Sequence, residues 1–390
     1  MRVVIGAHRG LAILIGLSTV LAACSGGAPM DTPESPSRRP TAVEPAPTRA
    51  AESAASSPLP SLPASPAATA GAPEPVDPVD FAWAPLDTAA GPAAREDHTW
   101  TVDGAGERAY LFGGRAGQPF GDLWAYDIAT DTWSELTPAG PTPPARFGHE
   151  AAWVDGIGLV VYAGQAGSTF FDDLWAYEPT RSRWVALPPS GDVPVARYGT
   201  CSGVGPDGRL WISHGFTSDG VRFSDTRAYD FSAQTWTDLT PGGEVPVNRC
   251  LHACWWTDAG QFTLYAGQTT GVTALGDLWR LDAPGTIDAA WRRDAAQALP
   301  PERNLPAVAR WSSGTVVFGG QAIDDGFLAD AWYLPDDGAP IALERTAVNA
   351  AVPAARAGAA LIADPERGRL LLFGGRNADG ALADIWGLAG

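Results

Sequence analysis

A short stretch recurs six times along this chain of 390 residues and limits the folds that are open to it. DLWAYD, which starts at Asp122, returns as DLWAYE at Asp173 and in altered form four more times. A glycine that closes an apolar run and an arginine that opens an alternating run recur in the same phase, at spacings of 50 to 55 residues. A regular period of this length indicates a repeat architecture.

Each repeat contains four runs of about five to eight residues, rich in aromatic and β-branched side chains and separated by turn formers. That pattern predicts a four-stranded antiparallel meander, and no stretch of the chain shows a convincing helical period. One such sheet is too small to bury both of its faces alone, so the six sheets are expected to pack face to face around an axis. We therefore predict an all-β fold, a six-bladed β-propeller.

The last repeat supplies three of these runs before Gly390. The segment 80–87, DFAWAPLD, precedes the first repeat and matches the pattern of a fourth strand, with Trp83 aligned on Trp133 and Trp184. We expect this N-terminal strand to complete the sixth blade, because pairing there joins the chain ends and removes an exposed sheet edge. The propeller is thus predicted to span residues 80–390.

The apolar run LFGG, the AYD that follows it and a tryptophan seven positions after Tyr126 resemble the kelch motif. The same spacing separates Tyr177 from Trp184 and Tyr229 from Trp236, and the resemblance covers residues 81–390. It implies a propeller similar to that of galactose oxidase and of sialic acid mutarotases. The copper site of galactose oxidase needs two tyrosines and two histidines, with one tyrosine linked to cysteine, and the chain offers no matching cluster.

Six positions depart from the kelch pattern. The first glycine of the pair is replaced in repeats two to four, and the tyrosine is replaced in repeats four to six. The substitutes are Ala163, His214, Ala266, Leu281, Leu334 and Leu388. Because they keep apolar bulk, we expect them to alter details of the blades and to leave the architecture intact.

The N-terminus has the pattern of an export signal. Arg2 and Arg9 precede an apolar run over residues 11–21, and small residues lead to Cys24 in the sequence LAAC. LAAC resembles the lipobox of bacterial lipoproteins, which implies a signal peptide over residues 1–23 and lipid on Cys24. An ordinary secretory signal is the alternative. Lipid on Cys24 would attach the protein to a bacterial membrane on its extracytoplasmic side.

Residues 24–79 consist mainly of Pro, Ala, Ser and Thr, with almost no large apolar side chains. Such a segment cannot bury a core, so we predict a disordered tether that acts as a spacer between the lipid anchor and the propeller.

The antiparallel strand order places the start of the first strand, the end of the second and the start of the third on one rim. The arginine that opens each repeat therefore shares a rim, the arginine rim, with the aspartate that opens each third strand. The arginines are Arg95, Arg146, Arg197, Arg249, Arg303 and Arg356, and the aspartates are Asp122, Asp173, Asp225, Asp277, Asp330 and Asp384.

Two roles are open for the arginines. They can clamp a carboxylate, sulfate or phosphate of a ligand, as kelch domains that bind acidic peptides do with arginines at the start of the inner strand. Each can instead pair with the aspartate of its own blade, and we favour this structural role. The loops on this rim vary in length and chemistry on a constant framework, which makes the arginine rim the candidate binding face.

Histidine gives no sign of a metal site. His98, His149 and His252 hold the third position after the arginine in repeats one, two and four, a placement that converges poorly across the axis. We expect these side chains to pack or to form backbone hydrogen bonds, and we assign no metal.

Besides Cys24, the chain has Cys201, Cys250 and Cys254. Cys250 and Cys254 are too far apart along one strand to pair with each other. A disulfide that uses Cys201, on the neighbouring inner strand, is chemically open to an exported protein. We slightly favour buried, unbridged cysteines over that disulfide.

The charge balance excludes one class of partner. The formal net charge is −18 and all 26 basic residues are arginine, so the surface repels phosphate backbones and nucleic acid is not expected. The lack of lysine also excludes Schiff-base chemistry.

We predict a monomeric binding or scaffolding module that takes a protein or glycan ligand on the arginine rim, without a cofactor and without catalytic residues. The alternative is a carbohydrate-active enzyme of the mutarotase or epimerase kind, with its site at the axial mouth. Glu96, Asp97 and Glu150 lie near that mouth, but no pair of carboxylates stands out among them.

Overall fold

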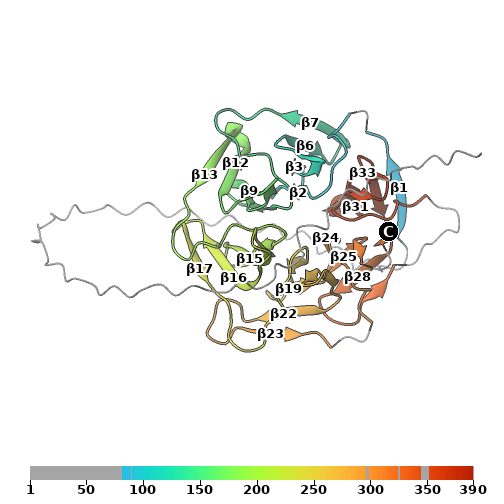
Figure 1. Cartoon of the computed structure of the whole chain (residues 1–390). Coiled ribbons are helices and arrows are strands. Elements are labelled where there is room, and N and C mark those ends of the chain that lie inside the picture. Colours follow the sequence, from blue (N-terminus) through green and yellow to red (C-terminus); the bar gives the residue numbers. More distant parts are fainter. Residues whose placement is uncertain (1–80, 89, 296–297, 324–325, 344–350, 390) are drawn as a thin grey trace, which may run out of the picture. The chain divides into compact units, whose positions relative to one another are not determined.

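Six four-stranded antiparallel sheets form a β-propeller in the computed structural model of this protein, so the predicted fold class is confirmed (Figure 1). The structure describes residues 81–88, 90–295, 298–323, 326–343 and 351–389. The predicted signal peptide (1–23), Cys24 and the predicted tether (24–79) lie outside these residues, as does Asp80. Within the described ranges, no helix has both the length and the apolar character needed to span a bilayer.

The four strands of a blade follow chain order from the axis outward, and the first strands of neighbouring blades contact one another. Blades one and two contain β2 (Thr99–Val102), β3 (Arg108–Phe112), β6 (Leu123–Asp127), β7 (Thr132–Leu136), β8 (Glu150–Val154), β9 (Gly158–Tyr162), β12 (Leu174–Glu178) and β13 (Arg183–Leu187). Blades three and four contain β14 (Cys201–Val204), β15 (Leu210–Phe216), β16 (Arg222–Asp230), β17 (Thr235–Asp238), β18 (Ala253–Trp256), β19 (Phe262–Tyr265), β22 (Leu278–Asp282) and β23 (Ala290–Arg293). Blade five contains β24 (Ala307–Trp311), β25 (Gly314–Phe318), β28 (Ala331–Pro335) and β29 (Ile341–Ala342).

The N-terminal strand closes the ring, as the sequence predicts. Blade six contains β30 (Ala360–Asp364), β31 (Arg369–Phe373), β34 (Ile385–Ala389) and, as its outer strand, β1 (Ala82–Leu86). Trp83 pairs with Leu388, just as Trp133 pairs with Tyr126 in blade one. Phe81, which directly precedes β1, is buried in the cluster between blades five and six. The strand that seals the ring thus also fills its core.

The hydrophobic core lies between neighbouring blades. One cluster joins Tyr110 and Phe112 of blade one to Leu159 and Val161 of blade two. The second strand of a blade is the most deeply buried, and every residue of β9 is buried. This follows because strands cover both of its edges and neighbouring blades cover both of its faces. The blades therefore stabilise one another by shared burial of apolar side chains.

Short hairpins project from the arginine rim between the second and third strands of five blades. They are β4 (Arg115–Ala116) with β5 (Gln118–Pro119), β10 (Gln165–Ala166) with β11 (Thr169–Phe170), β20 (Gln268–Thr269) with β21 (Thr273–Ala274), β26 (Gln321–Ala322) with β27 (Gly326–Phe327), and β32 (Arg376–Asn377) with β33 (Gly380–Ala381). In blade three the two main strands continue into the rim, where Phe216 pairs with Arg222 across a bulge-containing hairpin. Two 3₁₀ turns, η3 (Pro179–Arg181) and η4 (Pro365–Arg367), connect strands in blades two and six.

The three residues that replace the first glycine of the pair keep the backbone conformation of a glycine. Ala163, His214 and Ala266 have φ angles of 62°, 60° and 65°, close to the 63° of Gly113. A side chain in this left-handed region costs on the order of 1 kcal/mol, which the surrounding blade offsets. The departures from the motif therefore leave the architecture unchanged.

Candidate functional site

Every blade arginine is buried and bonded within its own blade. Arg95 donates two hydrogen bonds of 2.7 Å to the carboxylate of Asp122 and a third, of 2.9 Å, to the carbonyl oxygen of Gly113. Its Nε donates to the carbonyl oxygen of Ala93, and the ring of Phe120 covers the guanidinium at 4.2 Å. The same ion pair recurs as Arg146–Asp173, Arg197–Asp225, Arg249–Asp277, Arg303–Asp330 and Arg356–Asp384.

These pairs hold the first strand of a blade to the third. Burial on its own raises the pKa of Asp122, but the hydrogen bonds and the charge of Arg95 outweigh it, so that the pKa falls below its ordinary value. The six arginine residues are at most 1% exposed. A ligand on the rim would therefore meet none of their guanidinium groups, and the geometry supports the structural role.

A ring of backbone hydrogen bonds, here called the collar, encircles the axis at the arginine rim. Its members follow each blade arginine by two positions and have φ angles between 51° and 64°. Each N–H donates to the carbonyl oxygen of the matching residue in the preceding blade, at 2.8 to 3.1 Å. The collar runs through Asp97, Gly148, Gly199, Leu251, Leu305 and Gly358 and returns to Asp97. Each blade is thereby bonded to both of its neighbours.

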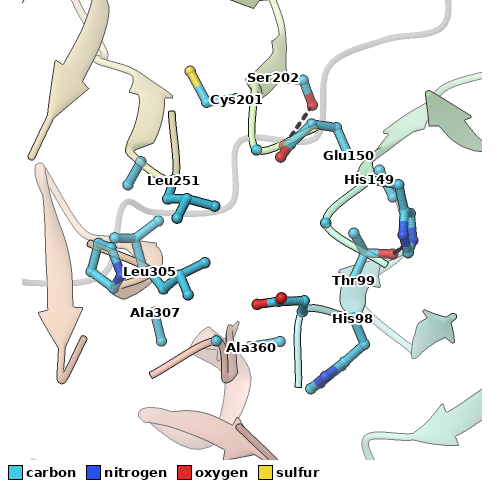
Figure 2. Close-up of a pocket in the computed structure, with 18 of the residues that line it drawn as sticks. His98, Thr99, His149, Glu150, Cys201, Ser202, Leu251, Leu305, Ala307 and Ala360 are labelled. Atoms are coloured by element: carbon cyan, nitrogen blue, oxygen red, sulfur yellow. Dashed lines mark hydrogen bonds between the residues drawn. The ribbon is translucent and has the colours of Figure 1, made fainter. Parts of the chain in front are cut away.

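The inner strands and the collar line a cavity of about 300 Å³ on the propeller axis (Figure 2). The two halves of its lining differ in chemistry. Blades one to three contribute the polar side chains of Thr99, Glu150 and Ser202, whereas blades five and six contribute small or aliphatic side chains such as Ala307 and Ala360. The axial cavity therefore has a polar wall and an apolar wall.

Glu150 is the acidic group of the polar wall. Ser202 donates a hydrogen bond of 3.2 Å from its hydroxyl to Oε2 of Glu150. Burial raises the pKa of Glu150 to about 8, and hydrogen bonding to Ser202 only partly opposes this shift. No cationic side chain of the described residues forms an ion pair with Glu150. The group therefore carries a proton at neutral pH for most of the time.

The histidines contact neighbouring blades. His149 shares a hydrogen bond of 2.9 Å between its Nε2 and Oγ1 of Thr99, and its ring meets Phe112 edge-on. The ring of His98 meets Phe373 in the same way. Burial lowers the pKa of His98 to about 3, so its ring is neutral. In the part of the chain that the structure describes, no group of three His, Cys, Asp or Glu side chains could hold a metal ion.

The expectation of unbridged cysteines is wrong. Cys201 of β14 and Cys254 of β18 form a disulfide that joins the inner strands of blades three and four, with their Cα atoms 5.7 Å apart. Cys201 follows its blade arginine by four positions, and Cys254 follows the arginine of the next blade by five. Glu150 and Ser202, which share a hydrogen bond, occupy the equivalent two positions in blades two and three. Cys250 is buried and lies outside the bridge.

The outer part of the arginine rim carries a second charged network. Glu96 lies between two arginines from hairpins on neighbouring blades, 3.1 Å from Nε of Arg115 and 2.6 Å from Nε of Arg376. Burial and the adjacent charge of Asp97 raise the pKa of Glu96 to about 7, while the arginines oppose this shift. Arg115 also pairs with Asp97 at 3.1 Å. These rim arginines are thus engaged by carboxylates of the chain itself.

Arg222 differs from every other buried arginine of the described chain. Eight arginines are buried, and seven of them contact a carboxylate: the six blade arginines and Arg280, which pairs with Asp294 at 3.2 Å. Arg222 is 4% exposed, and within the described residues its Nε and Nη2 meet no hydrogen-bond acceptor. Its guanidinium carbon lies 5.8 Å from the ring centre of Phe216. A buried charge without a counter-charge is costly.

Exposed apolar side chains flank Arg222 on the rim of blade three. Val221 and Val247 are 50% and 48% exposed. The side-chain amide of Asn248 donates a hydrogen bond of 2.8 Å to the carbonyl oxygen of Arg222, which fixes the segment from blade four beside the hairpin of blade three. Together these residues form an apolar patch around a buried cation.

Comparison with known proteins identifies the repeats. The KLHDC2/KLHL20/DRC7 Kelch-repeats domain family matches residues 76–263. The chain carries a kelch-repeat propeller. Kelch domain-containing protein 10 of Xenopus tropicalis is 30% identical to it over 191 residues, 45% of this chain and 45% of that protein. Leucine-zipper-like transcriptional regulator 1 of Homo sapiens is 27% identical over 259 residues, 62% of this chain and 29% of that protein.

The kelch match spans less than half the length of these curated relatives. Among solved structures, that of YjhT aligns with a TM-score of 0.61 at 18% identity and covers 76% of this chain and 95% of YjhT. At this level of identity the likeness shows the fold alone.

The kelch pattern did not single out the rim arginines outside the six ion pairs. Arg115 and Arg376 follow the second glycine of the pair, a position that is polar in five of the six repeats, and this periodic signal could have found them. Arg222 lies in the blade-three hairpin, which differs in length from the others, so no periodic signal marks it.

Proposed function

We propose that this chain is an extracytoplasmic, lipid-anchored kelch propeller that binds a partner on the arginine rim, and that the partner is a protein with an acidic residue at the contact. Kelch propellers are a type of protein-binding scaffold, and the family match over residues 76–263 supports such a role for this chain. The rim carries hairpins of differing chemistry on a constant framework, an arrangement typical of recognition surfaces.

The observation that carries the proposal is Arg222. Its Nε and Nη2 form one edge of the guanidinium group, an edge that suits bidentate binding of a carboxylate. Both atoms are buried in the free protein, so the Arg222 side chain has to turn outward as the partner binds. Arginines surrounded by apolar side chains are frequent anchors of protein interfaces, and Val221 and Val247 supply that surround. An Asp or Glu of the partner would give Arg222 the counter-charge that the other buried arginines find within the chain.

Two features support the proposed location. Residues 21–24 read LAAC and end at Cys24, which resembles the lipobox. The disulfide between Cys201 and Cys254 suits an oxidising compartment, because disulfides rarely persist in the cytosol. Growth with an alkyne-labelled fatty acid should label the wild-type protein and leave Cys24→Ala unlabelled. Label that persists in Cys24→Ala would overturn the lipid anchor.

Binding is tested with the full chain on peptide and glycan arrays. We expect capture of peptides in which Asp or Glu adjoins an aliphatic residue, and no capture of their Asn or Gln versions. Arg222→Met should weaken this binding at least tenfold, whereas Arg209→Met, in a turn of the opposite rim, should not. Binding to sugars with turnover of the sugar would support the carbohydrate-active alternative.

A stability measurement separates recognition from a structural role. Because Arg222→Met removes an unpaired buried charge, its melting temperature should equal or exceed that of the wild type. Arg197→Met breaks a buried ion pair and should melt well below the wild type. If the melting temperature of Arg222→Met is as low as that of Arg197→Met, then Arg222 has a structural role and the proposal that it anchors a partner is wrong.

A further inference from the structure

The axial cavity is lined by neither Arg222 nor the rim hairpins, and it has an acidic group without a cation. Glu150 and Ala360 are both partly exposed, and they contribute to the polar and the apolar wall of the cavity. Figure 2 shows Glu150 and Ser202 across the cavity from Leu305 and Ala307. A volume of about 300 Å³ is at the lower end of the range for small-ligand pockets, roughly 300 to 1,000 Å³.

The surroundings of Glu150 prepare it as an acceptor. The hydroxyl of Ser202 donates a hydrogen bond to its carboxyl group, and a donor of this kind favours the carboxylate form. Burial disfavours the carboxylate form, and no arginine of the described chain forms an ion pair with Glu150 that would offset this effect. A ligand with a positive charge would supply the cationic partner that Glu150 lacks within the described chain.

The other titratable groups of the cavity lining differ from Glu150 in their partners or their charge. Asp97 in the collar already has a cationic partner, since its Oδ2 lies 3.1 Å from Arg115 and accepts a hydrogen bond of 3.2 Å from the hydroxyl of Tyr198, while its Oδ1 has no hydrogen-bond partner within the described residues. Burial lowers the pKa values of His98, His149 and His252, so these rings add no positive charge. Glu150 is therefore the one group of the described cavity lining that lacks a strong partner of opposite charge.

The wall facing Glu150 selects the remainder of the ligand. Ala307, Val308 and Ala360 offer methyl groups and no polar side-chain atom. Contact with this wall favours an aliphatic chain, since burial of apolar surface contributes about 25 cal/mol per Å².

From this arrangement we propose that the axial cavity binds a small aliphatic ammonium ion, with its charged nitrogen on the carboxylate of Glu150 and its alkyl chain against the wall formed by Ala307, Val308 and Ala360. The ammonium ion enters with its own charge, and Glu150 gives up its proton to solvent as the ion pair forms. The site does not involve Arg222 or the rim hairpins, so it stands or falls independently of the proposed partner.

The test is isothermal titration of the full chain with n-butylammonium chloride at pH 7, with 1-butanol and sodium butyrate as matched probes. We expect n-butylammonium to bind, 1-butanol to bind at least tenfold more weakly and butyrate not to bind. Titrations in buffers of different ionisation enthalpy should show release of up to one proton per bound ion. Equal binding of 1-butanol and n-butylammonium would overturn the proposal.

Two variants locate the site. Glu150→Gln keeps the shape of the side chain and should weaken n-butylammonium binding at least tenfold and abolish proton release. Ala360→Leu fills the apolar wall and should weaken n-butylammonium more than methylammonium. Glu178→Gln, on the third strand of blade two, is the control and should bind as the wild type does. Unchanged affinity and proton release in Glu150→Gln would place the ion elsewhere and overturn the assignment.

Discussion

The disulfide between blades three and four provides a quantitative test of the structure. Replacing both Cys201 and Cys254 by alanine removes a cross-link that spans a sequence separation of 53 residues. In the chain-entropy model, closing a loop of this length lowers the entropy of the unfolded chain by about 14 cal/mol/K, which corresponds to about 4 kcal/mol at 25 °C. We therefore expect the double variant to lose about 4 kcal/mol of unfolding free energy.

The fold itself should survive this change. The collar bond from the N–H of Leu251 to the carbonyl oxygen of Gly199 still joins the same two blades, and the cluster that includes Trp211, Phe262 and Trp291 still packs between them. Urea unfolding followed by tryptophan fluorescence measures the difference, and peptide mapping without reductant identifies the linked peptides.

The control is reductant. Wild-type protein in dithiothreitol should unfold as the double variant does, while Cys250→Ala should keep its sensitivity to reductant because Cys250 lies outside the bridge. Unfolding curves that superimpose for the wild type and the double variant without reductant would show that the bridge does not stabilise the folded protein. In that case the oxidising compartment would also lose its support.

Two further predictions concern the axial cavity and the ring closure. Because the folded protein holds the proton of Glu150 with a pKa of about 8 against an ordinary 4.5, stability should fall as pH rises between these values, by about 5 kcal/mol at most. Urea midpoints between pH 5 and pH 8.5 should show this dependence in the wild type and much less of it in Glu150→Gln; parallel profiles would contradict it. Phe81→Ala should cost about 3 kcal/mol, since Phe81 is 3% exposed, and deletion of residues 80–87 should lower the melting temperature in calorimetry by more than that single change. An unchanged melt after the deletion would rule out closure by β1.

The repeats allowed the blades, their number and the closing strand to be predicted from the sequence. Within a blade, neighbouring strands are also neighbours in sequence, so aromatic spacing such as Tyr126 to Trp133 reports directly on pairing. The position of Trp83 extended this reasoning to the seam, where it pairs with Leu388 as expected. In this fold, the spacing of the repeated residues in the sequence therefore predicts which strands pair within a blade.

Contacts between blades could not be predicted in this way. The disulfide joins residues whose sequence separation says nothing about their distance across the gap between two sheets. The collar depends on backbone conformation, and the positive φ of Leu251 and Leu305 has no signature in residue type, unlike the glycines at the matching positions. The lone charge of Arg222 is visible only when the surroundings of all buried arginines are compared.

The collar has a consequence for how this protein can change in evolution. Its donors all face the preceding blade, so the six bonds circulate in one rotational sense and close without a loose end. If one repeat were inserted or deleted, the collar would have to close at a different radius with all of its hydrogen bonds formed. A collar that failed to close would leave one N–H and one C=O group unpaired at the centre of the molecule. Substitutions in a single hairpin leave the collar intact, so the sequence of the rim can vary while the number of blades stays constant.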